Sequence, residues 1–269
     1  MSSDIMPMTE PRPRRQRSQG SGAADAALLF DEPGPRGRIL IAIGSVVAVI
    51  GIAALAAAVL YRLDLAGQLD YPKWRYFLGQ SVVSQLLEAA GTTLTLGGVA
   101  AVLTFPLGIA LGWLRLLDNR PIKWLIGLWI DAMRAVPMLL LVYFFLLVVP
   151  RFATISDFWK LALPIVMCTS ATTAEVFRSG VRALDRGQTE AAWALGMSPS
   201  LTMRLILAPQ ALRLMLPTLI TQMVTIIKGT TLAYVLAYPE LMYRGSTMIG
   251  QAKIDAHLSV FFQTYVIIA

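Results

Sequence analysis

The side chains that most often perform covalent or metal chemistry are scarce in this chain. It has one cysteine, Cys168, and one histidine, His257, far apart in the sequence. A single thiol permits neither an internal disulfide nor a thiolate metal cluster, and a Cys–His nucleophile pair is not expected. Cys168 is interpreted as a small apolar packing residue and His257 as a loop residue without special chemistry. No catalytic residue and no metal site are predicted.

Charged residues inside apolar segments are the next candidates. Asp131 and Arg134 lie three positions apart, on one face of an expected helix, so they can form an ion pair. A lone charge at the centre of a membrane helix costs about 2.5–3.5 kcal/mol, which pairing or nearness to the membrane edge reduces. The pair could belong to a gate or translocation path, or it could be a salt bridge that only fixes a helix end. The sequence leaves both interpretations open.

Lys228 lies within another apolar segment and is followed by the stretch GTTLA, which contains Thr230. Gly229 weakens a helix by about 1 kcal/mol, and a cation beside a helix break suits the carboxylate of a passing solute. The alternatives are a lysine that extends to the membrane interface or a partner for Glu175 or for another buried acid. Lys228 and Thr230 are therefore candidates for a substrate path.

Hydroxyl side chains are concentrated around Thr169 and Thr172. In membrane helices such residues hydrogen-bond across to a neighbouring helix more often than they contact a ligand. Helix packing is therefore the favoured interpretation, and a place on the substrate path is the alternative.

The composition shows which elements must hold these residues. Of the 269 residues, 56% are hydrophobic and 14% are charged, whereas soluble domains are about one quarter charged. This indicates an all-α, polytopic membrane protein. The net charge of +7 is then expected to orient loops and contact membrane lipid, and nucleic acid binding is not predicted.

The chain divides into four expected regions. Residues 1–38 are rich in Pro, Gly, Ser and Arg and are predicted to be a disordered basic tail. Residues 39–61 carry no charge and are long enough to span a bilayer. A loop over 62–88 precedes a multi-span domain, 89–269. The expected spans of that domain cover approximately residues 89–114, 124–149, 158–176, 215–236 and 258–269. The twelve residues from 258 are too few to cross, so the last helix is expected to be incomplete.

The distribution of Lys and Arg supports one orientation. With the N-terminus in the cytoplasm, the inside segments 1–38, 115–123 and 178–213 contain 14 of the 23 Lys and Arg residues, and the outside segments contain 7. This twofold bias satisfies the positive-inside rule. We expect a multi-pass protein of the bacterial plasma membrane whose residues 62–88 lie outside the cytoplasm.

A stretch with several helix-capping and helix-breaking residues, EAAWALGMSPSLTMRLILAPQ, lies on the expected cytoplasmic face. Thr189 is expected to cap a short helix that starts at Glu190, and Gly196 to end it in the left-handed conformation. Ser198 is expected to cap a second helix, which Pro209 would bend or end near Ala208. Residues 183–212 are thus predicted to form a helix–turn–helix elbow, called here the elbow.

This stretch resembles the EAA loop of ABC-importer permeases, with E-A-A, three residues, Gly, nine residues, Ile, two residues and Pro in register. The flanks AEVFRSGVRALDRGQTEAAWALGMS and PQALRLMLPTLITQMVTIIKGTTLA, together with RAVPMLLLVYFF, are similar to permeases of the polar amino acid type. The similarity covers about residues 91–269. Departures are Ala135, Val136, Ala208 and Gly229, none of which alters the EAA positions.

The resemblance implies a type I ABC-importer fold with one extra N-terminal transmembrane helix. It implies that the elbow couples to a cytoplasmic ATPase dimer, which uses ATP-Mg, through the residues Glu190, Ala191, Ala192, Leu195, Gly196, Ile206 and Pro209. The chain lacks a phosphate-binding loop of its own, so it is expected to bind no cofactor and not to be an enzyme. A second permease subunit, identical or not, and an extracytoplasmic binding protein for a polar amino acid, most favourably of the glutamate/glutamine type, are implied partners.

Two other functional classes fit the sequence less well. An ion-coupled secondary transporter usually shows an internal repeat, and none is evident. An integral-membrane enzyme requires clustered catalytic side chains near one membrane face, and the lone Cys and His argue against it.

Overall fold

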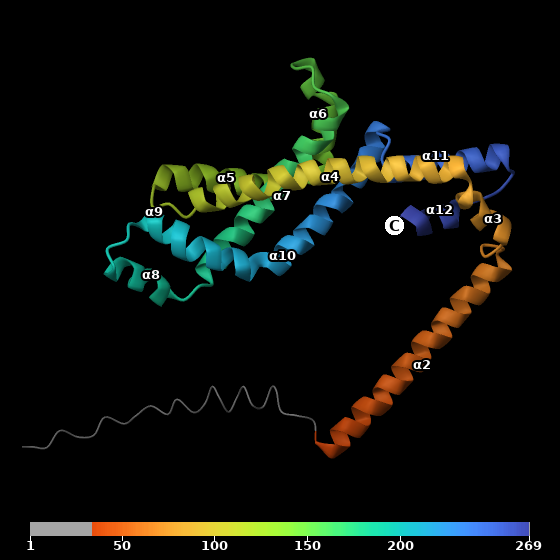
Figure 1. Cartoon of the computed structure of the whole chain (residues 1–269), viewed down its shortest axis with the longest axis horizontal. Coiled ribbons are helices and arrows are strands. Elements are labelled where there is room, and N and C mark those ends of the chain that lie inside the picture. The colour runs from red at the N-terminus through yellow and green to blue at the C-terminus, as the bar shows by residue number, and fades with distance from the viewer. Residues whose placement is uncertain (1–33, 269) are drawn as a thin grey trace, which may run out of the picture. The chain divides into compact units, whose positions relative to one another are not determined.

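A computed structural model describes residues 34–268. Within this range the chain is helical, and no strand occurs among the described residues (Figure 1). Residues 1–33 of the predicted disordered tail lie outside the described residues, as does Ala269. The prediction is wrong for 35–38, which form the first turn of a helix. The described chain divides into two compact units, one that ends at Ala66 and one that begins at Gly67.

Helix α2, Pro35–Leu65, makes up the described part of the first unit. It contains the whole uncharged run 39–61, and none of its residues is buried. Its 31 residues extend about 46 Å at 1.5 Å per residue, which exceeds a hydrocarbon core of about 30 Å. A helix that is apolar on every face is suited to lipid.

The second unit begins with short helices and one long helix. Residues 62–88, predicted as a loop, contain α3, Tyr71–Arg75, and the 3₁₀ turn η1, Tyr76–Leu78. They also contain the first turns of α4, Gln80–Leu114. The predicted span 89–114 is therefore the C-terminal part of a longer helix, because no helix-breaking residue separates its polar first turns from the apolar run.

Helix α4 packs closely on α7, Asp157–Arg182. A Cβ atom on Gly108 would lie 2.6 Å from Cβ of Thr173, and one on Gly112 would lie 2.6 Å from the carbonyl oxygen of Ala174. The G-x-x-x-G spacing thus permits the close approach that it predicts. The core around this contact includes Ile165 and Phe177.

The predicted span 124–149 is two helices. Helix α5, Arg120–Ala135, and α6, Met138–Leu147, which leads into the 3₁₀ turn η2, Val149–Arg151, are bent by 95° from one another. Val136 has extended backbone, with φ −78° and ψ 126°, as expected of a residue before proline, and Pro137 cannot continue a helix from the preceding turn.

The C-terminal part contains the remaining helices of the second unit. Their bounds are α8 Arg186–Ala194, α9 Pro199–Thr202, the π-helical η3 Met203–Leu207, α10 Ala208–Gly229, the 3₁₀ segment η4 Thr230–Leu236, α11 Leu241–Asp255 and α12 Phe261–Ile268. Figure 1 shows α8 and α9 together at one end of this unit, with α11 and α12 near the other end.

Three described helical stretches are long and apolar enough to cross a membrane, namely 35–65, 80–114 and 199–236. A fourth is added if the bent pair α5–α6 counts as one span. Helix α7, expected to span, is long enough but less apolar. Its hydroxyl run and its charges at Glu175 and Arg178 face neighbouring protein groups, as described below.

Candidate functional site

The first helix of the elbow starts earlier than the sequence predicts. Helix α8 begins at Arg186, and the Asp185 side chain caps it by accepting a hydrogen bond of 2.7 Å from the Gly187 amide. Thr189 and Glu190 therefore lie inside the helix, and the prediction that Thr189 caps it is wrong. Asp is preferred over Thr at the N-cap, and residues 186–189 form the first turn of α8.

The helix stop at Gly196 is confirmed. Gly196 has φ +76°, the left-handed region that glycine enters without steric cost. The Gly196 amide donates to the Trp193 carbonyl at 2.9 Å, and the Met197 amide donates to the Ala192 carbonyl at 3.1 Å. This pair of hydrogen bonds is a Schellman motif, which closes the C-terminus of α8.

The second helix of the elbow starts as predicted but does not end at Pro209. The Ser198 hydroxyl accepts from the Leu201 amide, and Pro199 occupies the first turn. The helix then passes through η3 into α10. Pro209 lies in the first turn of α10, directly after the π-helical segment, where the altered hydrogen-bond register accommodates its missing N–H. The elbow is therefore continuous with a long membrane helix.

Packing separates a buried from an exposed side of the elbow. Ala192, Thr202 and Leu207 are buried, and the Gln210 amide donates to the Gln188 side chain at 3.1 Å, which joins α10 to α8. Ile206 is partly buried against the same core. The exposed side carries the residues Glu190, Ala191, Trp193, Leu195 and Leu201, of which Trp193 is 57% and Leu195 82% exposed. Large apolar side chains gathered on a surface mark an interaction site.

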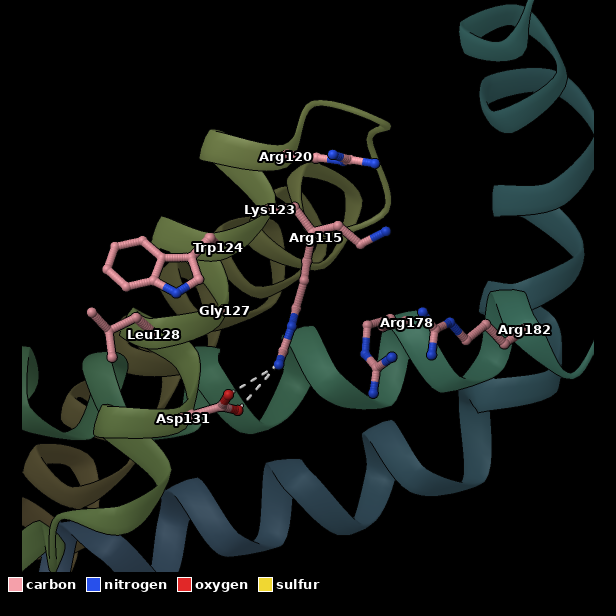
Figure 2. Close-up of a pocket in the computed structure, with 9 residues that line it drawn as sticks. All are labelled: Arg115, Arg120, Lys123, Trp124, Gly127, Leu128, Asp131, Arg178 and Arg182. Carbon is pink, nitrogen blue, oxygen red and sulfur yellow. Dashed lines mark hydrogen bonds and ion pairs between the residues drawn. The ribbon is translucent and has the colours of Figure 1, made fainter.

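A second cluster, the ion network, joins three helices. Arg115, at the end of α4, contacts Asp131 of α5 at 3.0 Å and Glu175 of α7 at 2.9 Å. Arg178 also pairs with Glu175. Figure 2 shows the Arg115 guanidinium lying over α5 toward Asp131. The buried Gly127 lies directly against it, since a Cβ there would be in van der Waals contact with the guanidinium at 3.5 Å.

The predicted pair Asp131–Arg134 is only loose, with 3.9 Å between charged atoms. Asp131 instead makes its shorter contact with Arg115, which sequence reasoning did not assign. Two signals could have found the network. Arg115 directly follows a long apolar helix, and Glu175 and Arg178 have i,i+3 spacing.

Lys228 and Thr230 lie at the junction of α10 and η4. Thr230 is buried and donates to the Ile227 carbonyl at 2.7 Å. Lys228 lines a mainly apolar cavity of about 490 Å³ together with Glu240. Glu175 is paired with Arg115 and Arg178, and no Lys228–Glu175 pair occurs among the described residues. Asp131 and Lys228 line different cavities, so the structure does not bring the candidate path residues into one site.

Glu240, which the sequence did not single out, is fully buried at the start of α11. Its carboxylate accepts from the Met242 and Tyr243 amides at 2.9 and 2.8 Å, so it caps the helix. Burial raises the pKa of the Glu240 carboxyl, and these two hydrogen bonds act in the opposite direction.

The hydroxyl run packs helices together. The Thr169 and Thr104 hydroxyls lie 2.8 Å apart across the α4–α7 contact. Thr172 donates to the Cys168 carbonyl of its own helix at 3.2 Å. Thr169 makes the interhelical bond that the packing interpretation requires, while a role for Thr172 on a substrate path stays a prediction.

Comparisons with known proteins identify relatives of this chain. Residues 104–269 match the family described as "Binding-protein-dependent transport system inner membrane component". The chain is 35% identical over 184 residues to the glutamate transport system permease protein GluD of Corynebacterium glutamicum, covering 66% of this chain and 67% of that protein. It is 32% identical over 178 residues to the probable glutamine ABC transporter permease protein GlnP of Bacillus subtilis, covering 66% and 80%.

The fold is also shared with a solved structure, an amino acid ABC transporter crystallised with histidines. The TM-score is 0.62 at 24% identity, with coverage of 70% of this chain and 86% of that chain. This likeness shows the type I importer fold. The matched family model covers more than half of the chain, and the chain therefore belongs to the binding-protein-dependent transport system inner membrane components, a family of multi-pass ABC transporter permeases.

Proposed function

We propose that this chain is the membrane-spanning subunit of an ATP-driven importer for a polar amino acid of the glutamate/glutamine type. Membership of the permease family and the names of the two relatives above support this assignment. ATP-Mg is used by a separate cytoplasmic ATPase dimer, and an extracytoplasmic binding protein delivers the substrate. The N-terminus lies in the cytoplasm, as the distribution of Lys and Arg indicates.

The observation that carries the coupling proposal is the construction of the elbow. Its tip exposes Trp193 and Leu195 next to a Schellman turn at Gly196, which provides a compact apolar surface for the ATPase. Its base is buried through Ala192 and Leu207 and is continuous with α10. A movement imposed on the tip would reach this membrane helix through the short turn 195–198 and through the Gln188–Gln210 hydrogen bond that joins α8 to α10.

The translocation path is proposed to form between two permease subunits, because the few spans of one chain surround too little space. The Lys228 ammonium, in its partly apolar cavity, would attract the substrate α-carboxylate, with Thr230 shaping the backbone beside it. The ion network would hold the cytoplasmic ends of α4, α5 and α7 in register while Asp131 and Arg134 contribute to a gate. The co-purification experiment described next also shows whether the second permease subunit is a copy of this chain or a different protein.

The first experiment is co-purification of the tagged chain with its partners, comparing wild type with the double variant Glu190→Lys plus Gly196→Asp. A matched control is Arg151→Glu, an exposed charge reversal on the expected outer side. An ATPase subunit should co-purify with wild type and control and be lost from the double variant. If the double variant retains the ATPase as well as wild type does, the elbow is not the coupling surface.

Uptake by proteoliposomes separates the importer from a secondary transporter. Glutamate or glutamine accumulation should require ATP together with the binding protein and should persist when ion gradients are collapsed by ionophores. Accumulation that needs an ion gradient and ignores ATP would contradict the proposal.

A further inference from the structure

A basic cavity of about 510 Å³ lies where α4 ends, α5 begins and α7 ends, and we call it the basic pocket (Figure 2). Its lining consists of Arg115, Arg120, Lys123, Trp124, Gly127, Leu128, Asp131, Arg178 and Arg182. Five of these residues are cations and one is an acid. The volume falls within the range of about 300–1,000 Å³ that is usual for ligand sites.

The ion network accounts for only part of this charge. Arg115 and Arg178 are neutralised by Asp131 and Glu175. Arg120, Lys123 and Arg182 form no ion pair with any described residue. Helix α5 also directs its N-terminal amides, which carry positive partial charge, toward this end. The basic pocket thus retains about three uncompensated positive charges.

The wall beside these cations is apolar and exposed. Trp124 is 69% and Leu128 53% exposed; both line the pocket, and in Figure 2 they project from α5 on the side away from Arg178 and Arg182. The pocket flanks residues 115–119, which connect the apolar α4 to the bent α5–α6 pair. The expected topology places these residues near a membrane–water interface, where tryptophan is enriched.

We propose that the basic pocket binds the phosphodiester headgroup of an anionic phospholipid on the cytoplasmic leaflet. Arginine guanidinium groups bind phosphate oxygens in bidentate fashion, and basic pockets between transmembrane helices recognise anionic headgroups. Trp124 and Leu128 lie along the first part of the acyl chains. A free phosphate ion would match the cations but would leave this apolar wall unused. The headgroup thereby stabilises the junction at which the ion network joins α4, α5 and α7.

The test uses the full-length chain purified in detergent and native mass spectrometry with added phosphatidylglycerol or phosphatidylcholine. The variant is Arg120→Gln, Lys123→Gln and Arg182→Gln, which spares the ion network and the elbow. The control removes three exposed cations on the expected outer side, Arg75→Gln, Arg151→Gln and Lys253→Gln, and gel filtration with the thermal midpoint verifies folding of each protein.

Wild type and control should retain phosphatidylglycerol in preference to phosphatidylcholine. Each neutralised cation weakens binding about fivefold, so the triple variant should bind roughly a hundredfold more weakly. Lys123→Gln alone is the mildest change and should reduce phosphatidylglycerol affinity about fivefold. This single variant replaces the triple variant in the test if the triple variant does not fold.

Three outcomes would overturn the proposal. The first is equal retention of phosphatidylglycerol by the triple variant and the control. The second is displacement of the lipid by millimolar inorganic phosphate or glycerol phosphate, which would indicate a site for free anions. The third is unchanged lipid binding with loss of a co-purified subunit, which would identify a protein interface. The elbow is unaltered in all of these variants, and coupling is tested by variants of the elbow itself, so the two proposals fail separately.

Discussion

Substitution of Gly108 by alanine tests the packing of α4 on α7 most directly. The added Cβ would lie 2.6 and 2.7 Å from Cβ and Cγ2 of Thr173 and 2.9 Å from the Ser170 carbonyl oxygen. Carbon atoms in contact prefer about 3.5–4.0 Å, so the helices must separate by about 1 Å. Overpacking of this kind costs about 1–3 kcal/mol, and the helix preference of alanine over glycine returns up to about 1 kcal/mol.

The net expectation is a loss of about 1–2 kcal/mol in the free energy of unfolding, obtained by combining these two effects. For a protein of this size that corresponds to a fall in the thermal midpoint of about 2–8 °C. The thermal midpoint is measured by tryptophan fluorescence of the detergent-purified chain. The interhelical Thr104–Thr169 hydrogen bond should weaken as the helices separate.

The matched control is Gly98→Ala on the same helix, where an added Cβ has no atom within 4 Å. It should leave the midpoint unchanged or raise it slightly, because only helix preference acts. If Gly108→Ala and Gly98→Ala shift the midpoint equally, close contact at Gly108 does not stabilise the α4–α7 pair and the reasoning is refuted.

Three further predictions concern the elbow, the ion network and the buried cap. Gly196→Ala should lower the free energy of unfolding by about 1–2 kcal/mol, because residue 196 has a left-handed backbone, and Gly196→Asn should lower it less. Equal ATPase retention and equal thermal midpoints for both variants and wild type would contradict this. Arg115→Gln should destabilise the chain by about 1–3 kcal/mol, because Glu175 loses a charged partner, whereas Arg134→Gln should change the midpoint little; the reverse order would show that the loose pair carries the stability. Glu240→Ala should lower the midpoint by removing both cap bonds, at about 0.5–2 kcal/mol. Because burial raises the pKa of Glu240 in the folded chain, its pH-dependent contribution is greatest below the unfolded pKa and is lost as pH rises through the folded value; Glu240→Gln should lack that dependence in a thermal unfolding series across pH.

Local chemistry explains what could be predicted about the elbow. Gly196, Ser198 and Pro199 act through their own backbone and through neighbours within a few residues, so their roles follow from residue type and spacing. The start of α8 was misplaced because Asp185 and Thr189 are both acceptable caps, and the choice depends on whether the intervening residues join the helix. Pro209 is expected to bend or end the helix, because the π-helical register that lets the helix continue is not visible in the sequence.

The sequence by itself determined the membrane class, the family, the elbow and the small residues that let α4 approach α7. These features depend on composition and on residue spacing within one helix, and both can be read from the sequence without knowing how the helices pack. Only the tertiary structure decided that Asp131 lies closer to Arg115 than to Arg134. It also decided that Glu175 pairs with two arginines and that five cationic side chains line one cavity. Ion pairs form across helices according to which side chains the packing brings within reach, and contacts 16 to 60 residues apart leave no periodic signal along the chain.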